Sequence, residues 1–249
     1  MNDAIIRPSI FLRYDAIRAA ISTATGNGSR SLFGMNLSYH VGDDPKLVRA
    51  NRQRFFRAAG ITEDSLALPG QVHSSTVRTV DAPGLYPESD ALITARAGLA
   101  VGVTVADCVP ILLYAPDRGA IAAVHAGWRG TAARITAGVV ESMMREFDIE
   151  PAVLVAYIGH AAGFCCYEVG ADAARWISPR SQRVRNGKIF VDLKSENRLQ
   201  LIDAGVSAAN IELSDACTIC SSWLHSYRRD RERSGRMMAV IGRTKTEGD

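Results

Sequence analysis

The sequence lacks the long apolar run that a membrane helix requires and the uninterrupted apolar core of a secretory signal. Its longest apolar stretch, residues 98–115, contains Asp107 and Pro110 and so falls short of the roughly 20 apolar residues that span a bilayer. The first residues, MNDAIIRPSIFLRY, carry charges where a signal would be apolar. We therefore expect a cytoplasmic protein with no membrane partner.

The sequence also has little cysteine and no strong excess of one charge. Five cysteines in 249 residues are an odd number, which does not suit a disulfide framework and agrees with a reducing compartment. The net charge is +3, and acids interrupt the densest basic run, SYRRDRERSGR. A nucleic-acid-binding protein would show a one-sided basic stripe, so we expect no nucleic-acid partner.

No Pro/Gly/Ser-rich linker, internal repeat or low-complexity block divides the chain, so residues 1–249 are expected to form a single catalytic domain. Helical patterns occupy residues 45–60, 131–147, 170–177 and 194–204. Strand patterns occupy residues 76–80, 91–94, 100–105, 109–114, 120–124, 153–158, 189–191 and 237–241. This mixture predicts an α/β (α+β) layered sandwich, in which a mixed β-sheet is flanked by helices.

The first predicted helix has both a start signal and a stop signal. Asp44 is a good N-cap residue, and Gly60 ends the helical pattern. The spacing of Leu47, Phe55 and Ala59 predicts that they lie near its buried face. For the helix at 131–147, the residue at position 131, a threonine, is the expected cap.

Three residues with soft-metal ligand atoms are the most informative feature: His73, Cys108 and His125. They lie in the short stretches LPGQVHSST, VTVADCVPILLY and AIAAVHAGWRGT. Two imidazoles and one thiolate suit zinc, and three protein ligands leave a fourth position for water or substrate. Taken singly, each of the three is equally explained as a packed core residue.

A predicted β-hairpin brings two of these residues together. The segments 109–114 and 120–124 flank the turn sequence APDRG. A turn centred between Pro116 and Asp117 makes Cys108 face His125, with Cβ atoms about 4.5–5.5 Å apart on one face of the sheet. A one-residue slip would put the two side chains on opposite faces. Local patterning does not place His73.

Further polar residues flank these positions. The sequence AGWRGT after His125 leads toward a helix whose N-terminus, together with Arg129, would bind an anion; a plain connecting loop is the alternative. Asp107 would orient a ligand of the neighbouring Cys108 site or cap a loop. Glu168, in the stretch IGHAAGFCCYEVG, would move protons or bind a ribose hydroxyl.

The remaining cysteines do not predict a second metal site. Cys165 and Cys166 are adjacent, so we do not expect them to chelate one ion and interpret them as packing or pocket residues. Cys217 and Cys220 form a CxxC, but a structural zinc needs a second pair. Even with His225 nearby, a fourth ligand is missing.

Together these stretches resemble the YfiH-type family, also called the laccase-domain or multicopper polyphenol oxidase-like family. The matching segments run from about Asn36 to Ile241 and include QVH, SDALIT, ADC, HAGWRGT, CCYEVG and CTIC. The resemblance implies a single-domain α/β fold. It also implies that His73, Cys108 and His125 are zinc ligands and catalytic residues, with copper as the alternative metal.

The resemblance further implies a pocket for a purine nucleoside and phosphate. Family members phosphorolyse adenosine, inosine, guanosine and methylthioadenosine, and deaminate adenosine. We expect substrate contacts from Asn36, Gln71, Asp107, Arg129, Glu168 and Arg228. Peptidoglycan-precursor editing by amide hydrolysis, copper-dependent polyphenol oxidation and metal storage without turnover are the alternatives. A laccase needs many histidines, and this chain has five.

The chain departs from the family pattern at four places. His160 and Phe164 stand where prolines are common, and His225 stands where an aromatic residue is usual. The sequence ATGNGS replaces GGVS near the N-terminus. We expect these departures to reshape the rim of the pocket.

Overall fold

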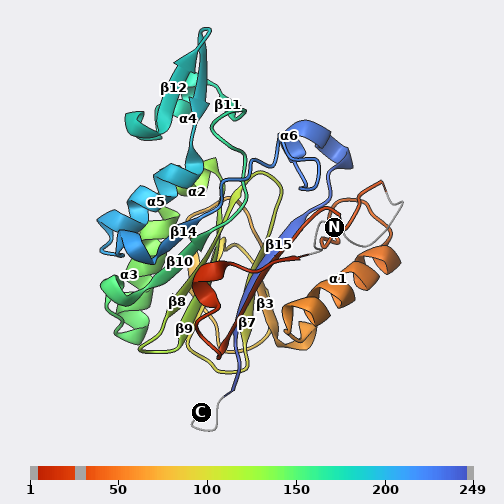
Figure 1. Ribbon diagram of the computed structural model, residues 1–249, viewed down its shortest axis with the longest axis vertical. Helices are drawn as coiled ribbons and strands as arrows, with labels where there is room; N and C mark the ends of the chain where they lie inside the picture. Colours follow the sequence, from red (N-terminus) through yellow and green to blue (C-terminus); the bar gives the residue numbers. More distant parts are fainter. Residues whose placement is uncertain (1–4, 26–31, 246–249) are drawn as a thin grey trace.

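The computed structural model describes residues 5–25 and 32–245, and two packed β-sheets lie at its centre (Figure 1). In spatial order, the first sheet contains β1 (Ile5–Ile6), β2 (Ile17–Ser22), β15 (Met237–Arg243), β7 (Ala100–Val105), β3 (Leu66–Pro69) and β5 (Gly84–Tyr86). The second contains β14 (Ile211–Leu213), β10 (Val155–Ile158), β8 (Val109–Ala115), β9 (Ala120–Ala126), β6 (Ala91–Thr94) and β4 (Val77–Thr79). Both sheets mix parallel and antiparallel pairs.

Helices cover the outer face of each sheet. In Figure 1, α3 (Ile135–Phe147) and α5 (Leu193–Asp203) lie on one side and α1 (Pro45–Ala59) on the other. A small sheet projects at the top, made of β11 (Glu168–Val169), β13 (Lys188–Val191) and β12 (Gln182–Arg185). The short helices are α2 (Trp128–Ala132), α4 (Ala171–Ala174), α6 (Tyr227–Asp230) and the 3-10 turns η1 (Ser9–Phe11), η2 (Glu63–Ser65), η3 (Pro151–Val153), η4 (Pro179–Ser181), η5 (Ala208–Asn210) and η6 (Arg231–Arg233). Among the helices of residues 5–25 and 32–245, none is long and apolar enough to cross a bilayer.

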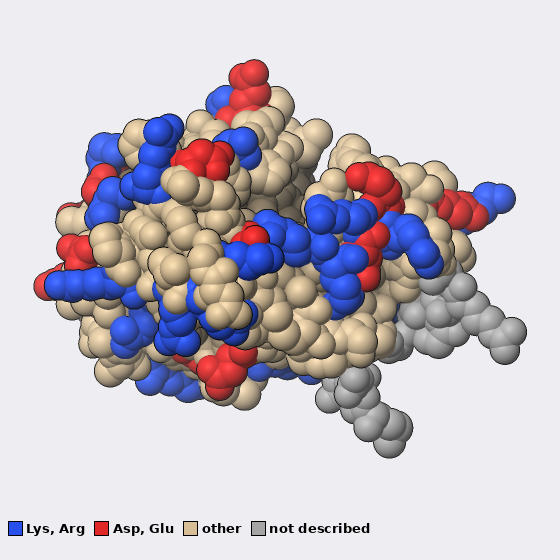
Figure 2. Space-filling view, turned by 90° about the horizontal axis from the view of Figure 1, so that it is seen from above, with Lys and Arg blue, Asp and Glu red and all other residues tan. Residues whose placement is uncertain are grey.

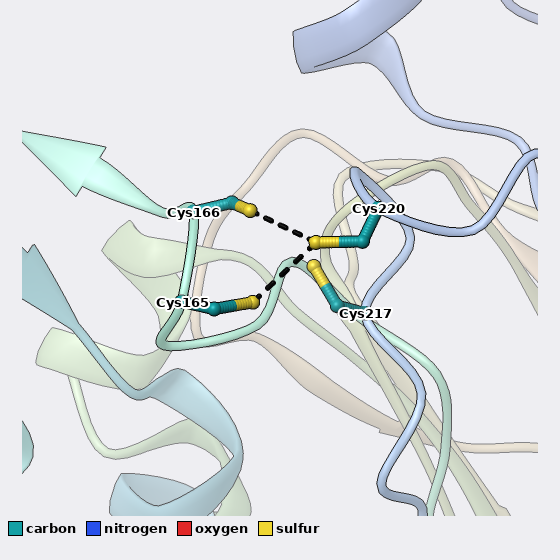
Figure 3. A group of neighbouring side chains, drawn as sticks. All are labelled: Cys165, Cys166, Cys217 and Cys220. Atoms are coloured by element: carbon teal, nitrogen blue, oxygen red, sulfur yellow. Dashed lines mark hydrogen bonds between the residues drawn. The ribbon is translucent and has the colours of Figure 1, made fainter.

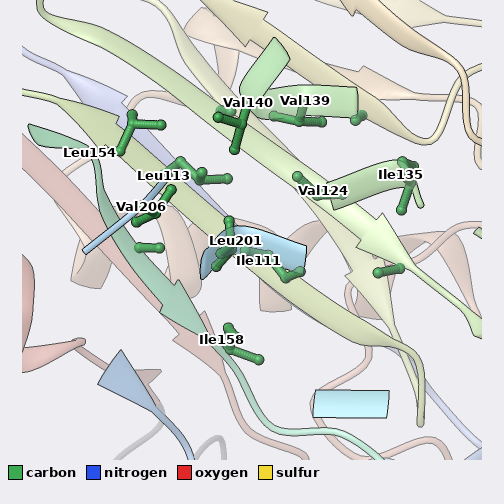
Figure 4. Close-up of a cluster of buried hydrophobic side chains, with 14 of the residues drawn as sticks. Ile111, Leu113, Val124, Ile135, Val139, Val140, Leu154, Ile158, Leu201 and Val206 are labelled. Atoms are coloured by element: carbon green, nitrogen blue, oxygen red, sulfur yellow. The ribbon is translucent and has the colours of Figure 1, made fainter. Parts of the chain in front are cut away.

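The two central strands β8 and β9 explain the layering. Both are buried along their whole length, because they have another layer on each face. Successive side chains of β8 alternate between faces: Ile111 and Leu113 pack toward α3 and α5 (Figure 4), whereas Leu112 packs toward the first sheet with Val103. A third cluster joins the other face of the first sheet to α1 through Phe55. The result is a four-layer α/β/β/α sandwich.

The predicted mixed α/β sandwich is therefore confirmed, with one difference. The sequence pattern led us to expect one mixed sheet, whereas two six-stranded sheets form the centre. The first sheet was not recognised as a separate sheet, because several of its strands are short or carry polar residues. The strand β2, with sequence IRAAIS, is one example, and β3 has only four residues.

The helix boundaries follow local signals at α1 but not at α3. The Asp44 carboxylate accepts the N–H of Lys46 at 2.8 Å, and Gly60 ends α1 at φ 69°. Leu47, expected near the buried face, is 42% exposed. The helix expected at 131–147 is broken by Arg134, whose φ of 59° is left-handed, so Thr131 lies inside α2 and is not a cap.

The hairpin of β8 and β9 forms, but with another register. His125 pairs with Pro110, and continuing the pairing past Val109 places Cys108 opposite Gly127, so the predicted pair of Cys108 with His125 is wrong. The loop takes four residues, 116–119, and closes through the N–H of its last residue, a left-handed glycine. The register therefore moves by two residues, and a two-residue shift keeps every side chain on its face. Cys108 and His125 still emerge on the same side.

Candidate active site

His73, Cys108 and His125 meet at the open end of the hairpin. Cys108 immediately precedes β8, His125 lies within β9, and His73 comes from the loop that follows β3 of the first sheet. One ligand atom from each residue lies within 4.8 Å of those of the other two. The two imidazole rings stand edge to face, with centroids 4.9 Å apart. The structure thus places His73, which local patterning could not do.

Asp90, which the sequence analysis overlooked, organises this site. Its fully buried carboxylate accepts N–H groups of Val72, His73 and Ser74 and lies 2.7 Å from Nδ1 of His125. One carboxylate therefore holds both the loop that carries His73 and the ring of His125. Such a contact fixes the orientation of a ligating imidazole and leaves its Nε2 for the site. The available signal was an acidic residue at the start of the apolar strand β6.

The charges of the three residues are strongly coupled. Burial by itself would raise the pKa of Cys108, but the charge and hydrogen bond of His125, with help from His73, outweigh burial and lower this pKa to about 6. Burial would lower the pKa of His125, but the Cys108 thiolate and Asp90 raise it to about 9. The pocket therefore stabilises a thiolate at neutral pH, which is the form that binds metal.

Gly127 leaves the space in front of these side chains open. A Cβ atom at this position would lie 3.1 Å from Sγ of Cys108, 3.1 Å from Cδ2 of His73 and 3.9 Å from Cε1 of His125. Two imidazoles and a thiolate around such a cradle fit a zinc ion, because zinc prefers nitrogen and sulfur ligands in a tetrahedral arrangement. The donor set and the cradle together make this group a candidate metal site.

Gly127→Ala is expected to lower metal affinity, and any turnover that depends on the bound metal, about tenfold. The backbone of Gly127, at φ −72° and ψ 173°, tolerates alanine, so only the added methyl group acts, by displacing Cys108 and His73 by a few tenths of an ångström. Gly138→Ala in α3 is the control, since a Cβ there meets nothing within 4 Å. Steady-state kinetics and zinc titration of both variants measure the effect; equal values for the two would contradict the cradle.

Two of the expected substrate residues are occupied by contacts within the protein. The Gln71 amide donates to the carbonyl of Thr104 at 2.7 Å and accepts its N–H at 2.8 Å. Asn36 is fully buried, and its side chain binds Ser38 and Arg236. Gln71 therefore ties the His73 loop to β7, and Asn36 braces the interior. Each amide already has partners within the protein, and its contact with a substrate stays a prediction.

Asp107 likewise positions protein segments. Its carboxylate accepts the hydroxyl of Thr218 and the backbone N–H of Arg228 at 2.5 Å each. Its φ of 82° is left-handed and turns the chain just before Cys108. In this structure Asp107 thus anchors the segment before α6. The carboxylate that orients a possible ligand is that of Asp90, which contacts His125.

The two expected basic residues, Arg129 and Arg228, lie around the site, whereas the Glu168 side chain is paired with another residue. The Glu168 carboxylate pairs with Lys188 of β13 at 2.9 Å. The guanidinium of Arg228 donates to the Glu168 carbonyl and lies 5.0 Å from the ring centre of Tyr167. Arg129 is exposed and stacks on Trp128.

Tyr167 and Arg236 are further residues near Cys108 that the sequence analysis missed. Burial, and then the Cys108 charge, raise the pKa of Tyr167 to about 12, while Arg228 and Arg129 oppose this shift. Burial lowers the pKa of Arg236, and the charges of Cys108 and Asp107 oppose that shift. Figure 2 shows basic side chains gathered over the α6 region of this face, beside a hollow in the surface.

The departures from the family pattern lie mostly in the interior. His160 and His225 are buried, and the His160 ring packs edge-on against Trp223. Phe164 is partly buried under the guanidinium of Arg183. The expected effect on a pocket rim is therefore not seen for the two histidines. Most of the ATGNGS segment lies outside the described residues.

The stability of the protein is expected to fall as the pH is lowered from about 6.5 to 4. Burial, and for His160 also the charge of Lys194, lowers the pKa of both His160 and His225 to about 4. The unfolded chain binds these two protons from about pH 6.5 downward, whereas the folded chain resists them. Each histidine then removes about 1.4 kcal/mol of stability per pH unit within that window.

Denaturant unfolding between pH 7 and 4.5 measures this slope. His225→Phe removes one of the two titrating groups. The slope of the unfolding free energy against pH should then fall by about 1.4 kcal/mol per pH unit, the contribution of one proton. The exposed His40→Gln is the control and should leave it unchanged. The variants are compared by this slope and not by their absolute stability, because each substitution also changes packing and hence the stability at any one pH. Identical slopes in all three proteins would contradict the buried neutral histidines.

Comparison with known proteins identifies the family. A sequence profile described as multi-copper polyphenol oxidoreductase laccase matches residues 18–244. The chain belongs to this family. It is the YfiH-type family of laccase-like domains. The match includes all of the second sheet, most of the first sheet and the three residues His73, Cys108 and His125.

Relatives in the YfiH-type family carry names of nucleoside enzymes. The purine nucleoside phosphorylase YlmD of Geobacillus stearothermophilus is 36% identical over 245 residues, which covers 90% of this chain and 89% of that protein. A purine nucleoside phosphorylase of Deinococcus radiodurans is 38% identical, with coverages of 94% and 92%. Adenosine deaminase RL5, from an unknown prokaryotic organism, is 36% identical, with coverages of 90% and 93%.

Solved structures of the family share the fold. The crystal structure of YlmD from Geobacillus stearothermophilus superimposes with a TM-score of 0.90 at 33% identity and covers 98% of both chains. The Bacillus licheniformis hypothetical protein YfiH gives a TM-score of 0.85 at 31% identity, with coverages of 92% and 93%. The layered α/β fold of this chain is thus the fold of the YfiH-type family.

Proposed function

We propose that this chain is a metal-dependent purine nucleoside enzyme of the cytoplasm, with residues 1–249 as one catalytic domain. It would phosphorolyse adenosine, inosine, guanosine and methylthioadenosine and deaminate adenosine. The observation that carries the proposal is the convergence of His73, Cys108 and His125 around the space that Gly127 leaves open. The names of the relatives, purine nucleoside phosphorylase and adenosine deaminase, support the substrate class.

His73, Cys108 and His125 would hold a zinc ion, with copper as the alternative. Bound there, the ion supplies positive charge that polarises an oxygen or nitrogen of the substrate or of water. Asp90 keeps the His125 ring in one orientation, and the coupled charges keep Cys108 a thiolate. The protein therefore contributes a thiolate and an aligned His125 ring, and binding of the ion would displace the proton that this ring carries at neutral pH.

In phosphorolysis, an oxygen of phosphate attacks C1′ of the ribose while the bond from C1′ to the purine nitrogen breaks. The bonding electrons leave with the purine, which then takes up a proton. Arg129, Arg228 and Arg236 are the cations we assign to phosphate, since each influences the charge balance around Cys108 or Tyr167. The dipole of α2 adds little, because this helix has only five residues.

Tyr167 would contact the purine. Its pKa of about 12 keeps the phenol protonated at neutral pH, so it can donate a hydrogen bond to a ring nitrogen as negative charge develops there. In deamination, water replaces the amino group of adenosine, and ammonia leaves. The purine then has to lie with its amino group toward His73, Cys108 and His125.

A nucleoside panel with and without phosphate tests this function. Appearance of free purine only with phosphate is the expected sign of phosphorolysis, and inosine formed from adenosine without phosphate is the sign of deamination. Chromatography of the products separates the two. A peptidoglycan-precursor amide and a phenol serve as comparison substrates; turnover of either, with no product from any nucleoside, would contradict the proposal.

A further inference from the structure

Four cysteines outside the candidate active site form a second cluster. Cys165 and Cys166 lie in the loop between β10 and β11, and Cys217 and Cys220 lie in the segment between β14 and α6. All four Sγ atoms lie within 4.8 Å of one another and point toward a common centre (Figure 3). Two of the pairs are hydrogen-bonded: Cys166 with Cys220 at 3.0 Å and Cys165 with Cys220 at 3.5 Å.

The fold supplies the second pair that the CxxC lacked. A tight turn, in which the N–H groups of Cys166 and Tyr167 both donate to the Gly163 carbonyl, directs the two adjacent cysteines to the same side. In an extended strand adjacent side chains would point to opposite faces, which is why the sequence argued against shared chelation. The interpretation of Cys165 and Cys166 as packing residues therefore changes.

The distances suit a metal with four sulfur ligands. Zinc binds thiolates at about 2.3 Å, so the sulfurs of a regular tetrahedral site lie about 3.8 Å apart. The two hydrogen-bonded separations of 3.0 Å and 3.5 Å and the upper limit of 4.8 Å for all pairs bracket that value. Small rotations of the four side chains would make them equal. A disulfide, in contrast, would use only two of the four sulfurs.

Gly163 both donates to the cluster and leaves room for it. The Gly163 N–H donates to Sγ of Cys217 at 3.2 Å. Gly163 is also needed for space, because a Cβ there would lie 2.7 Å from Cβ of Cys217 and 3.3 Å from Sγ of Cys165.

The cluster joins the two segments that border the candidate active site. Next to it, the Thr218 N–H donates to the Ala161 carbonyl, and the Thr218 hydroxyl donates to Asp107. On the other side, the chain continues from Cys166 directly into Tyr167. A metal ion at the cluster would therefore hold the loop that carries Tyr167 against the segment that leads to Arg228.

We propose that Cys165, Cys166, Cys217 and Cys220 form a structural site for a zinc-class soft metal ion, separate from the His73, Cys108 and His125 group. On binding, the thiol protons go to solvent and four metal–sulfur bonds form, with no change of oxidation state. The ion would stabilise the loops around the pocket and take no part in the reaction.

Metal content of the purified protein tests the proposal, with Cys108→Ala as the deciding variant because it leaves the cluster intact. Cys108→Ala should retain one equivalent of zinc per chain, and replacement by cobalt should give the intense absorption of a four-thiolate site. The double variant Cys217→Ser with Cys220→Ser should lose that equivalent and the four-thiolate spectrum. Thermal unfolding should occur at a lower temperature in the double variant than in Cys108→Ala.

The possible results separate this proposal from the proposed function. Two equivalents of zinc in the wild-type protein support both sites. One equivalent of zinc in the wild-type protein, retained in Cys108→Ala, supports the cluster alone. Cys108→Ala without bound metal after growth and dialysis with zinc overturns the cluster. A disulfide among the four cysteines in protein purified without oxygen, detected by mass spectrometry after thiol alkylation, also overturns it.

Discussion

Cys108→Ala is expected to lower kcat/KM for every nucleoside substrate by about a thousandfold while the fold is retained. The thiolate is the anionic member of the three ligands, and its loss leaves only two imidazoles for the metal. A metal ion contributes several kcal/mol of charge stabilisation in a transition state, and about 4 kcal/mol corresponds to a factor of about a thousand in rate. Steady-state kinetics on adenosine and inosine, with and without phosphate, measure the loss.

The controls for Cys108→Ala have to show that activity is lost because a ligand is removed and not because the protein unfolds. Cys108 is only partly buried, and alanine removes one sulfur atom, so circular dichroism and the unfolding midpoint should remain close to those of the wild type. Met144→Ala, at an exposed position of α3, is a matched truncation distant from the site in sequence and should retain activity. Nucleoside turnover by Cys108→Ala at the wild-type rate would refute a catalytic role for the three residues.

Asp90→Asn is expected to destabilise the protein by about 3–5 kcal/mol and to weaken metal binding about 10- to 100-fold. One carboxylate oxygen accepts from Val72 and twice from Ser74, and the other accepts from His73 and contacts His125. An asparagine has one NH₂ group in place of an oxygen. In either orientation, this NH₂ faces donors and leaves at least one buried N–H unpaired.

Denaturant unfolding and zinc titration measure the two effects of Asp90→Asn. The exposed Asp81→Asn is the control for the same chemical change and should alter neither quantity. Both effects should occur together, because one carboxylate holds the His73 loop and the His125 ring. If Asp90→Asn lost stability and kept full zinc affinity, Asp90 would brace the loop without orienting the ligand.

Short-range signals in the sequence predicted much of the local structure. The cap at Asp44, the stop at Gly60 and the strands β6 and β7 depend on residues close in the chain, and their bounds agree with expectation. The shared face of Cys108 and His125 also followed, because side chains in strands repeat every two residues. The register itself was wrong, because the loop of residues 116–119 is centred between Asp117 and Arg118, one position after the predicted centre.

Residues that act through distant contacts were predicted poorly. Asn36 and Gln71 were expected in the pocket from the family resemblance, and in the structure their amides bind backbone groups. Asp90 was missed because its five contacts reach residues 16 to 35 positions away in the chain. A sequence shows which side chains can make hydrogen bonds, but not which partners folding brings to them.

The sequence by itself determined the chemistry that is available: two imidazoles and a thiolate at His73, Cys108 and His125, the family, and the alternation that puts two of the three on one face. Only the tertiary structure decided which groups meet. It brought the His73 loop of the first sheet to the hairpin of the second, and it brought Cys165 and Cys166 to Cys217 and Cys220. Local patterns follow from neighbouring residues, whereas these contacts arise from the packing of whole layers, which no short stretch of sequence contains.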